Sequence, residues 1–175
     1  MKKNNILLIV NPVSGVKNNR LSAQNIIEYF KKKSINIDTI YTTKKGFAKQ
    51  YVFNLTANQY NSLLILGGDG TINEVLNGIL SRNDQYLPTL GFLPGGTGNS
   101  VLHDLGYLTI KDALSPIIKK QIKYIDVMTF QFSNFIEYSI NILGWGLVSD
   151  IAILAEKLRF LGSSRYNIAS IYYIL

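Results

Sequence analysis

Over the first 123 residues, short aliphatic runs alternate with segments in which apolar residues recur every three or four positions. The aliphatic runs at residues 6–10, 63–66 and 90–93 are typical of buried strands, and residues 35–41 predict a further strand. Helical spacing is found at residues 23–30, 48–55, 72–80 and 110–118, with a short helix expected at 101–105. Strands that alternate with helices predict an α/β fold, a three-layer domain around a parallel sheet with right-handed crossovers.

The pattern changes near residue 123. Residues 124–132 and 135–143 are strand-like, and Ser133-Asn134 between them is typical of a turn, so we expect a β-hairpin. We therefore expect an α/β domain at residues 1–123 and the beginning of a second, antiparallel domain at residues 124–175. The last five residues are apolar and carry no stop signal, so we expect the second domain to be truncated here.

Three of the predicted strands end in loops of small and polar residues. These loops are Asn11-Pro12-Val13-Ser14-Gly15, Gly67-Gly68-Asp69-Gly70-Thr71 and Pro94-Gly95-Gly96-Thr97-Gly98-Asn99. The carboxyl ends of parallel strands lie along one edge of a sheet, where ligands bind. Bare N–H groups at a helix N-terminus favour phosphate, and we expect those of Gly68, Gly70 and Gly96 to bind the oxygens of a polyphosphate.

A carboxylate within the second loop indicates that a metal ion is bound together with the phosphate. Asp69 would repel phosphate unless a cation lies between them, so the economical interpretation is a nucleotide site in which Asp69 acts through Mg²⁺. The alternative is structural, because Gly-Asp-Gly is a common turn and Thr71 with Glu74 predicts a capping box. Thr109 and Asp112 form a second predicted capping pair.

The net charge of the chain indicates the kind of molecule that it binds. With 18 Lys and Arg against 11 Asp and Glu, the formal charge is +7, which favours an anionic partner such as a nucleotide or an acidic membrane surface. No basic helix or aromatic platform suggests nucleic acid. There is no cysteine, and no apolar stretch is long enough for a signal peptide or a membrane span. We expect a cytoplasmic protein that contacts the membrane surface transiently, as a peripheral protein.

Taken in order, the motifs resemble one family. Asn11 to Gly15, GGDGTINEVLNG at residues 67–78 and PGGTGN at residues 94–99 are followed by Gly144-Trp145-Gly146 and by EKLRFLGSSRY at residues 156–166. In this order and spacing they resemble the diacylglycerol kinase catalytic-domain superfamily, which includes bacterial lipid kinases, sphingosine kinases and ceramide kinases. GGDGT alone also occurs in NAD kinases and phosphofructokinases, whereas its combination with PGGTGN is specific.

The resemblance implies an N-terminal α/β nucleotide-binding domain, a C-terminal β-sandwich, and phosphoryl transfer from ATP to the hydroxyl of a diacylglycerol, sphingoid or ceramide-like lipid. Asp69 would be the essential catalytic acid and would hold Mg²⁺, and Asp150 would face the lipid or cap a strand end. The residues expected to contact ATP are Asn11, Ser14, Gly15, Thr42, Gly67, Gly68, Gly70, Thr71, Asn73, Glu74, Gly95, Gly96, Thr97, Asn99, Arg159 and Arg165. The expected partners are ATP and a lipid acceptor, without nucleic acid, and a homodimer is compatible with the sequence.

Several alternatives stay open at this stage. Asp69 could coordinate Mg²⁺ or act as the base that orients the lipid hydroxyl. Arg159 and Arg165 could reach the phosphates or form ordinary ion pairs, for instance with Glu156. Where sphingosine kinases carry an acidic residue, this chain has Ala152, which argues against sphingosine itself as the acceptor. The alternative functions are a soluble-metabolite kinase of the NAD kinase type and a nucleotide-binding fragment that is inactive without its C-terminal part.

Overall fold

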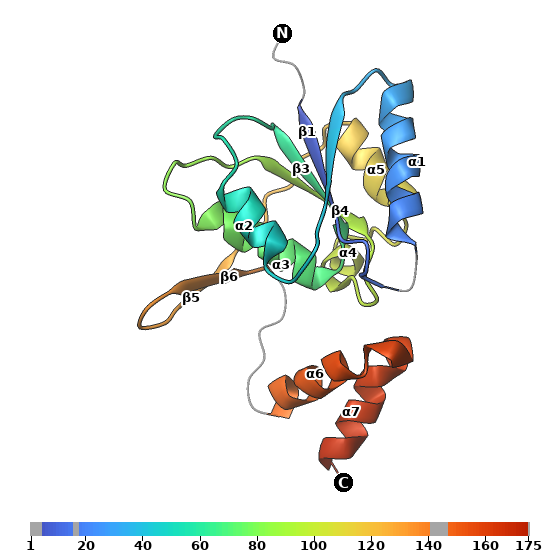
Figure 1. Ribbon diagram of the computed structural model, residues 1–175, viewed down its shortest axis with the longest axis vertical. Helices are drawn as coiled ribbons and strands as arrows, with labels where there is room; N and C mark the ends of the chain where they lie inside the picture. The colour runs from blue at the N-terminus through green and yellow to red at the C-terminus, as the bar shows by residue number, and fades with distance from the viewer. Residues whose placement is uncertain (1–4, 16–17, 141–146, 175) are drawn as a thin grey trace. The chain divides into compact units, whose positions relative to one another are not determined.

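A parallel four-stranded sheet forms the core of the first of two units. The computed structural model describes residues 5–15, 18–140 and 147–174, in two compact units, Met1–Ile140 and Asn141–Leu175. In the first unit the strands are β1 (Ile6–Val10), β2 (Ile37–Tyr41), β3 (Ser62–Gly67) and β4 (Thr89–Pro94), in the order β2-β1-β3-β4 (Figure 1). All neighbouring strands are parallel, which confirms the predicted α/β fold.

The position of each strand in the sheet explains its sequence. β1 is an inner strand with neighbours on both sides, and all five of its residues are buried. Strands covered on both faces are continuously apolar, as Ile6–Val10 is. β2 lies at the edge and carries the exposed polar residue Asp38.

The direction in which the chain adds strands across the sheet changes between β1 and β3, although all the strands are parallel. From β1 the chain crosses to β2 on one side, and it then returns past β1 to β3 on the other side. The register pairs Val10 with both Tyr41 and Leu66, and Gly67 with Pro94, so the strands end level with one another. In open parallel sheets, ligands bind outside the carboxyl ends of the strands at such a reversal.

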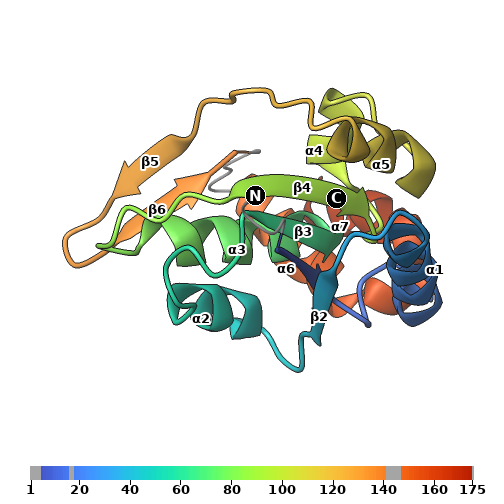
Figure 2. The same cartoon turned by 90° about the horizontal axis from the view of Figure 1, so that it is seen from above.

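Helices cover both faces of the sheet and complete three layers. They are α1 (Asn19–Lys32), α2 (Phe47–Phe53), α3 (Asp69–Leu80), α4 (Ser100–Asp104) and α5 (Ile110–Ile118). Figure 2 shows α2 and α3 on one side of the sheet, with α1, α4 and α5 on the other. Phe30 from α1 and Leu102 from α4 are among the largest fully buried side chains, so these helices are anchored by the core.

Local capping confirms one sequence prediction for α5. The Thr109 hydroxyl accepts the N–H of Asp112 at 3.2 Å, and the Asp112 carboxylate accepts the N–H of Thr109 at 3.0 Å. This reciprocal pair is the predicted capping box. At α1, the Asn18 side chain accepts the N–H groups of Arg20 and Leu21 in the same role.

The predicted hairpin is present and is shorter than the sequence pattern indicated. β5 (Met128–Gln131) pairs antiparallel with β6 (Ile136–Ser139), and the end of the predicted second strand, residues 141–143, lies outside the described residues. Asn77 of α3 binds the hairpin: its amide nitrogen donates to the Tyr138 carbonyl at 2.8 Å, and its oxygen accepts the Tyr138 N–H at 2.9 Å. The hairpin therefore belongs to the first unit, and the domain boundary predicted after residue 123 falls within that unit.

The second unit is helical where a β-rich segment was expected. It contains α6 (Leu147–Lys157), a 3₁₀-helix η1 (Arg159–Ser164) and α7 (Arg165–Ile174). α6 and α7 pack together around the buried residues Ala155 and Ala169, and Gly162, with φ of 59°, allows the bend between them. Of the predicted β-sandwich, the described residues contain the two-stranded β5–β6 sheet. No helix in the described ranges has the length and apolarity needed to cross a bilayer.

Candidate functional site

The three small-residue loops meet at one end of the sheet. We call the segment after β1 loop 1 (residues 11–15), the junction of β3 and α3 loop 2 (Gly67 and Gly68) and the segment between β4 and α4 loop 3 (residues 95–99). The Ser14 hydroxyl of loop 1 donates to the Gly95 carbonyl at 2.8 Å, and the Gly95 N–H donates to the Gly67 carbonyl at 3.1 Å. Figure 1 shows α3 and α4 at this same end of the strands. The predicted convergence of the loops is confirmed.

Glycines allow the loop backbones to touch. A Cβ on Gly96 would lie 2.4 Å from the Cα of Gly68, and a Cβ on Gly15 would lie 2.7 Å from the Gly95 oxygen. Gly15 also has a φ of 68°, which disfavours any side chain. These glycines are therefore required by contact between the loops, whether or not a ligand binds.

Two further glycines have no such explanation. A Cβ on Gly70 would meet no atom within 4 Å apart from its own helix and chain neighbours, and a Cβ on Gly98 would make ordinary contacts of 3.5 Å with the Asp69 carboxylate and 3.9 Å with the Ser100 hydroxyl. Neither residue has a positive φ. Gly70 lies in the first turn of α3, where N–H groups have no partner within the helix. The open space beside these N–H groups suits an anionic ligand.

Asp69 joins α3 to α4. One carboxylate oxygen accepts the N–H and the hydroxyl of Ser100, at 3.1 and 3.3 Å, and the other accepts the Val101 N–H at 3.2 Å. A carboxylate offers about four acceptor positions, so these bonds leave room for a cation. The described ranges contain no group of three or more His, Cys, Asp or Glu placed to hold a metal ion. A cation at Asp69 would therefore need ligands from a bound molecule.

The pKa values that depart clearly from their usual range belong to groups elsewhere in the described structure. Burial, reinforced by the hydrogen bond to Asp38, raises the pKa of Tyr60 to about 12. Burial also raises the pKa of Tyr86, and the neighbouring Arg82 lowers the pKa of Asp84. These residues lie at the amino-terminal ends of the strands or near the end of α3, and they do not touch the three loops.

Comparison with known proteins identifies the family. The family model described as "Diacylglycerol kinase catalytic domain" matches residues 5–130. The chain belongs to the diacylglycerol kinase catalytic domain family. The three loops and α3, with its glycine motif, all lie inside the matched range.

Relatives in this family show the same likeness along the whole chain. Sphingosine kinase 1 of Arabidopsis thaliana is 32% identical over 180 residues, which cover 97% of this chain and 37% of that protein. Human ceramide kinase is 27% identical over 184 residues, covering 95% of this chain and 34% of that protein. The crystal structure of a diacylglycerol kinase from Bacillus anthracis aligns with a TM-score of 0.62 and 30% identity, covering 73% of this chain and 46% of that one. The chain thus spans between a third and a half of the length of these relatives.

Within this diacylglycerol kinase domain, the predicted capping box at α3 is wrong. The residue that caps α3 is Gly68, and the Thr71 hydroxyl instead accepts the Asn11 amide at 2.9 Å. The carboxylate of Glu74 reaches across to α2 and accepts the N–H groups of Gly46 and Ala48, at 2.8 and 3.1 Å. Both side chains find partners on distant segments, which a local spacing rule does not include.

One predicted phosphate donor is already engaged within the protein. The N–H of Gly96 donates to the Asn99 side chain at 2.8 Å, and the Asn99 amide donates back to the Gly96 carbonyl at 2.9 Å. Asn99 has a φ of 53°, so this pair shapes the turn of loop 3. Gly96 and Asn99 therefore stabilise loop 3, and the donors facing the open space are to be sought at the start of α3.

The other expected nucleotide contacts in the first unit lie near the loops. Thr42 follows β2, and its N–H donates to the Val10 carbonyl at 2.8 Å, which places it at the same end of the sheet. Thr97 lies partly buried in loop 3. Asn73 is exposed on α3, where its carbonyl accepts the Asn77 amide at 2.9 Å.

The expected arginines lie in the second unit. Arg165 is 8% exposed, and its guanidinium lies 3.7 Å from the Glu156 carboxylate and donates to the Tyr166 hydroxyl at 3.0 Å. The ion pair considered as an alternative for Arg165 is thus present, and a phosphate contact stays a prediction. Arg159 begins η1, and its side chain lies outside the described structure. Asp150 is exposed in the first turn of α6 and not at a strand end; residues 144–146 are outside the described ranges.

Sequence reasoning missed the roles of three residues: Asn19 at the loops, and Asn77 and Gly78 where α3 packs against the hairpin and α2. Asn19 and Asn77 are each 1% exposed, and both make several hydrogen bonds. A Cβ on Gly78 would lie 2.5 Å from the Lys49 carbonyl, so glycine lets α2 approach α3. The Asn77-Gly78 end of the long glycine motif was a usable signal for packing, whereas nothing in the sequence marks Asn19.

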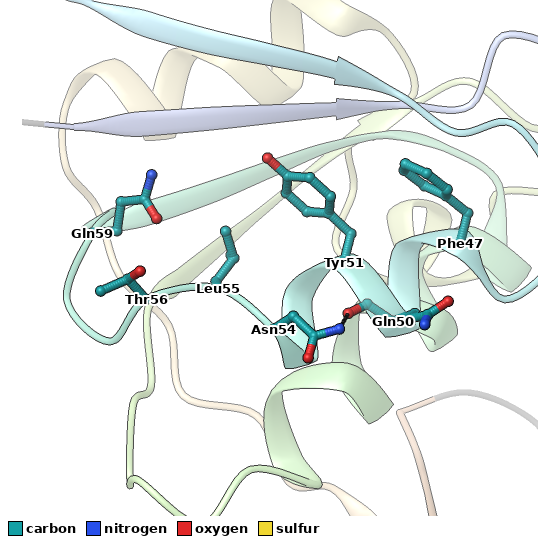
Figure 3. Close-up of a pocket in the computed structure, with 7 residues that line it drawn as sticks. All are labelled: Phe47, Gln50, Tyr51, Asn54, Leu55, Thr56 and Gln59. Atoms are coloured by element: carbon teal, nitrogen blue, oxygen red, sulfur yellow. Dashed lines mark hydrogen bonds between the residues drawn. The ribbon is translucent and has the colours of Figure 1, made fainter.

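Two hollows in the described surface lie away from the loops. One, of about 400 Å³, is lined by Phe47, Gln50, Tyr51, Asn54, Leu55, Thr56 and Gln59. Figure 3 shows Tyr51 and Leu55 pointing from α2 and the following segment toward the sheet. The other, of about 740 Å³, lies between the hairpin and the ends of α2 and α3. Neither of these two hollows contains a residue of the three loops.

Proposed function

We propose that this protein is the nucleotide-binding part of a lipid kinase, which transfers the γ-phosphoryl group of ATP to a lipid hydroxyl. The observation that carries the proposal is the open space at Gly70, beside three loops bonded to one another at the ends of parallel strands. The family match and the sphingosine kinase and ceramide kinase relatives support a lipid acceptor.

The start of α3 supplies the anion-binding part of the proposed site. N–H groups in its first turn, including that of Gly70, have no acceptor within the helix, and the helix dipole places partial positive charge there. The absence of a side chain at Gly70 lets phosphate oxygens approach these groups closely. Phosphoryl transfer requires mainly positioning and charge neutralisation, which such a backbone surface provides.

Asp69 would act together with Mg²⁺ on the ATP phosphates. Mg²⁺ is commonly bound through one or two carboxylates plus substrate phosphates, and Asp69 is the carboxylate next to the open space. The bonds from Ser100 and Val101 hold that carboxylate in a fixed orientation. The bound metal ion would neutralise charge on the phosphates, while the start of α3 holds their oxygens.

In the reaction, the lipid hydroxyl oxygen forms a bond to the γ-phosphorus as the bond to the bridging oxygen of ADP breaks. The hydroxyl proton leaves to a base, and Asp69 is the candidate in the first unit only in the alternative in which it does not hold Mg²⁺. Asp150 in the second unit is the proposed contact for the lipid head. Ala152, where sphingosine kinases carry an acid, favours a ceramide- or diacylglycerol-like acceptor over sphingosine.

The decisive experiment measures binding and turnover with the same protein. ATP binding is measured by calorimetry with Mg²⁺, and transfer of labelled phosphate is followed with diacylglycerol, ceramide, sphingosine and NAD as acceptors. We expect ATP binding and a labelled lipid product, both lost in Asp69→Ala. Labelled NADP as the product would replace the proposal with the NAD kinase alternative. Protein that binds no ATP would refute it.

A second candidate follows from the length of the chain. Because this chain aligns with 37% of sphingosine kinase 1 from Arabidopsis thaliana, it could bind ATP and still lack residues needed for turnover. ATP binding without transfer to any acceptor would favour this nucleotide-binding fragment.

A further inference from the structure

The buried side chain of Asn19 connects loop 1 to loop 3. Asn19 is the first residue of α1, it is 1% exposed, and it follows loop 1 in the chain. Its amide nitrogen lies 2.9 Å from the Asn11 carbonyl and 3.1 Å from the Ser14 carbonyl of loop 1. The same nitrogen lies 2.9 Å from the Ser14 hydroxyl and 2.9 Å from the Gly95 carbonyl of loop 3.

The orientation of this amide is fixed by its surroundings. Three of the four neighbouring atoms are carbonyl oxygens, which accept hydrogen bonds and cannot donate them, so the nitrogen must face them. The Asn19 oxygen is buried and has no hydrogen-bond partner among the described residues. An unpaired buried acceptor is unfavourable. The Asn19 side chain thus donates hydrogen bonds to the loop carbonyls while its own oxygen stays without a hydrogen bond among the described residues.

Drawing these carbonyls inward has an electrostatic consequence. In a planar trans peptide, the C=O and the following N–H point in opposite directions. With the Ser14 carbonyl directed to Asn19, the N–H of Gly15 is turned away from Asn19. Partial negative charge from Asn11, Ser14 and Gly95 is collected around one buried donor, and it is removed from the surface that would face an anion.

We propose that Asn19 is a positioning residue for the polyphosphate. It holds the carbonyls of loops 1 and 3 away from the ligand and keeps the two loops together, without touching the ligand itself. The proposal rests on the nucleotide site described under the proposed function. It assigns a role to a residue outside the glycine loops that is buried and carries no charge.

The test replaces the donor with an acceptor of the same shape. Asn19→Asp at neutral pH sets a carboxylate against three carbonyl oxygens and provides no N–H group. The matched control is Asn77→Asp, because Asn77 is also 1% exposed and also donates its amide to backbone carbonyls, yet it binds the hairpin instead of the loops. Both variants lose buried amide bonds, so both lower the melting temperature.

Affinities for Mg²⁺–ATP and for AMP are measured by calorimetry, at a temperature where each variant is folded by circular dichroism. We expect Asn19→Asp to raise the Kd for ATP by at least about tenfold and to change that for AMP much less, since AMP uses fewer of the phosphate donors. Asn77→Asp should keep the wild-type ATP affinity. A purely structural role would weaken ATP and AMP alike.

The outcomes separate this inference from the proposed function. Wild-type affinity in Asn19→Asp, or an equal loss for ATP and AMP, overturns the positioning role and leaves the nucleotide site standing. Absence of ATP binding by the wild-type protein overturns the nucleotide site itself, and this inference with it. If Asn19→Asp does not fold, Asn19→Ser, which keeps one hydroxyl donor, is measured in the same way and judged by the same ATP-to-AMP comparison.

Discussion

Replacement of Gly70 by alanine tests whether the open space at the start of α3 is a ligand site. The added Cβ would have no protein atom within 4 Å apart from its own helix and chain neighbours, and Gly70 has no positive φ, so the protein itself can accept the change. Alanine favours a helix over glycine by about 0.5–1 kcal/mol, and less in the first turn. We therefore expect the free energy of unfolding to stay the same or to rise slightly.

Nucleotide affinity should respond in the opposite direction. A phosphate oxygen bound to an N–H lies about 2.9 Å from the nitrogen, so a methyl group beside Gly70 would compete with it for space. Displacing the phosphate weakens one or two hydrogen bonds to a charged group, each worth about 1.5–3 kcal/mol. We expect the Kd for Mg²⁺–ATP to rise about 10- to 100-fold or more.

The matched control is Gly78→Ala on the same helix. Its Cβ would lie 2.5 Å from the Lys49 carbonyl, so overpacking should lower stability by about 1–3 kcal/mol. ATP affinity, measured by calorimetry below the melting temperature, should stay at the wild-type value. Urea denaturation and calorimetry on both variants should thus give opposite patterns. Unchanged ATP affinity in Gly70→Ala would show that the space beside α3 does not receive the phosphates.

Two further predictions concern stability. Glu74→Ala removes the acceptor for the N–H groups of Gly46 and Ala48 at the start of α2. The free energy of unfolding, measured in urea titrations, should fall by about 1–2 kcal/mol, and amide exchange should become faster at both residues. Wild-type stability would contradict the role of Glu74 in capping α2. Tyr60 has a folded-state pKa of about 12, above its usual value of 10.0, so its contribution is complete below pH 10 and is lost between pH 10 and 12. A shift of that size corresponds to a free energy on the order of 2 kcal/mol, so Tyr60→Phe should lose less stability than the wild type over that pH range in urea titrations. An unchanged alkaline slope would count against it.

The sheet and the meeting of the loops could be predicted because both follow from local sequence. The aliphatic run Ile6–Val10 identifies an inner strand, and parallel strands bring their carboxyl ends together. The partners of individual side chains could not be predicted. Thr71 and Glu74 have the spacing of a capping box, yet their partners are Asn11, Gly46 and Ala48, which lie 26 to 60 positions away in the sequence. Long-range hydrogen bonds of this kind depend on the assembled fold.

The second unit was harder to predict for a different reason. Residues 147–174 are rich in Ile, Leu and Tyr, which suit strands and helices alike, and the preceding hairpin suggested that strands would continue. In the structure, Ala155 and Ala169 lie where α6 meets α7, because small side chains let two helices pack closely. The recurrence of Ile151, Leu154 and Leu158 at helical spacing was the overlooked signal.

Three attachments along α3 fix the number of residues between its first turn and Asn77. Within 12 residues this helix presents its first turn to the loops, its Glu74 carboxylate to α2 and its Asn77 amide to β6. Inserting one residue after Ile72 would turn everything that follows by about 100° and move it about 1.5 Å along the axis. The loops would keep their place, while α2 and the hairpin would each lose their attachment. Homologous chains should therefore show no insertion or deletion between Gly70 and Asn77.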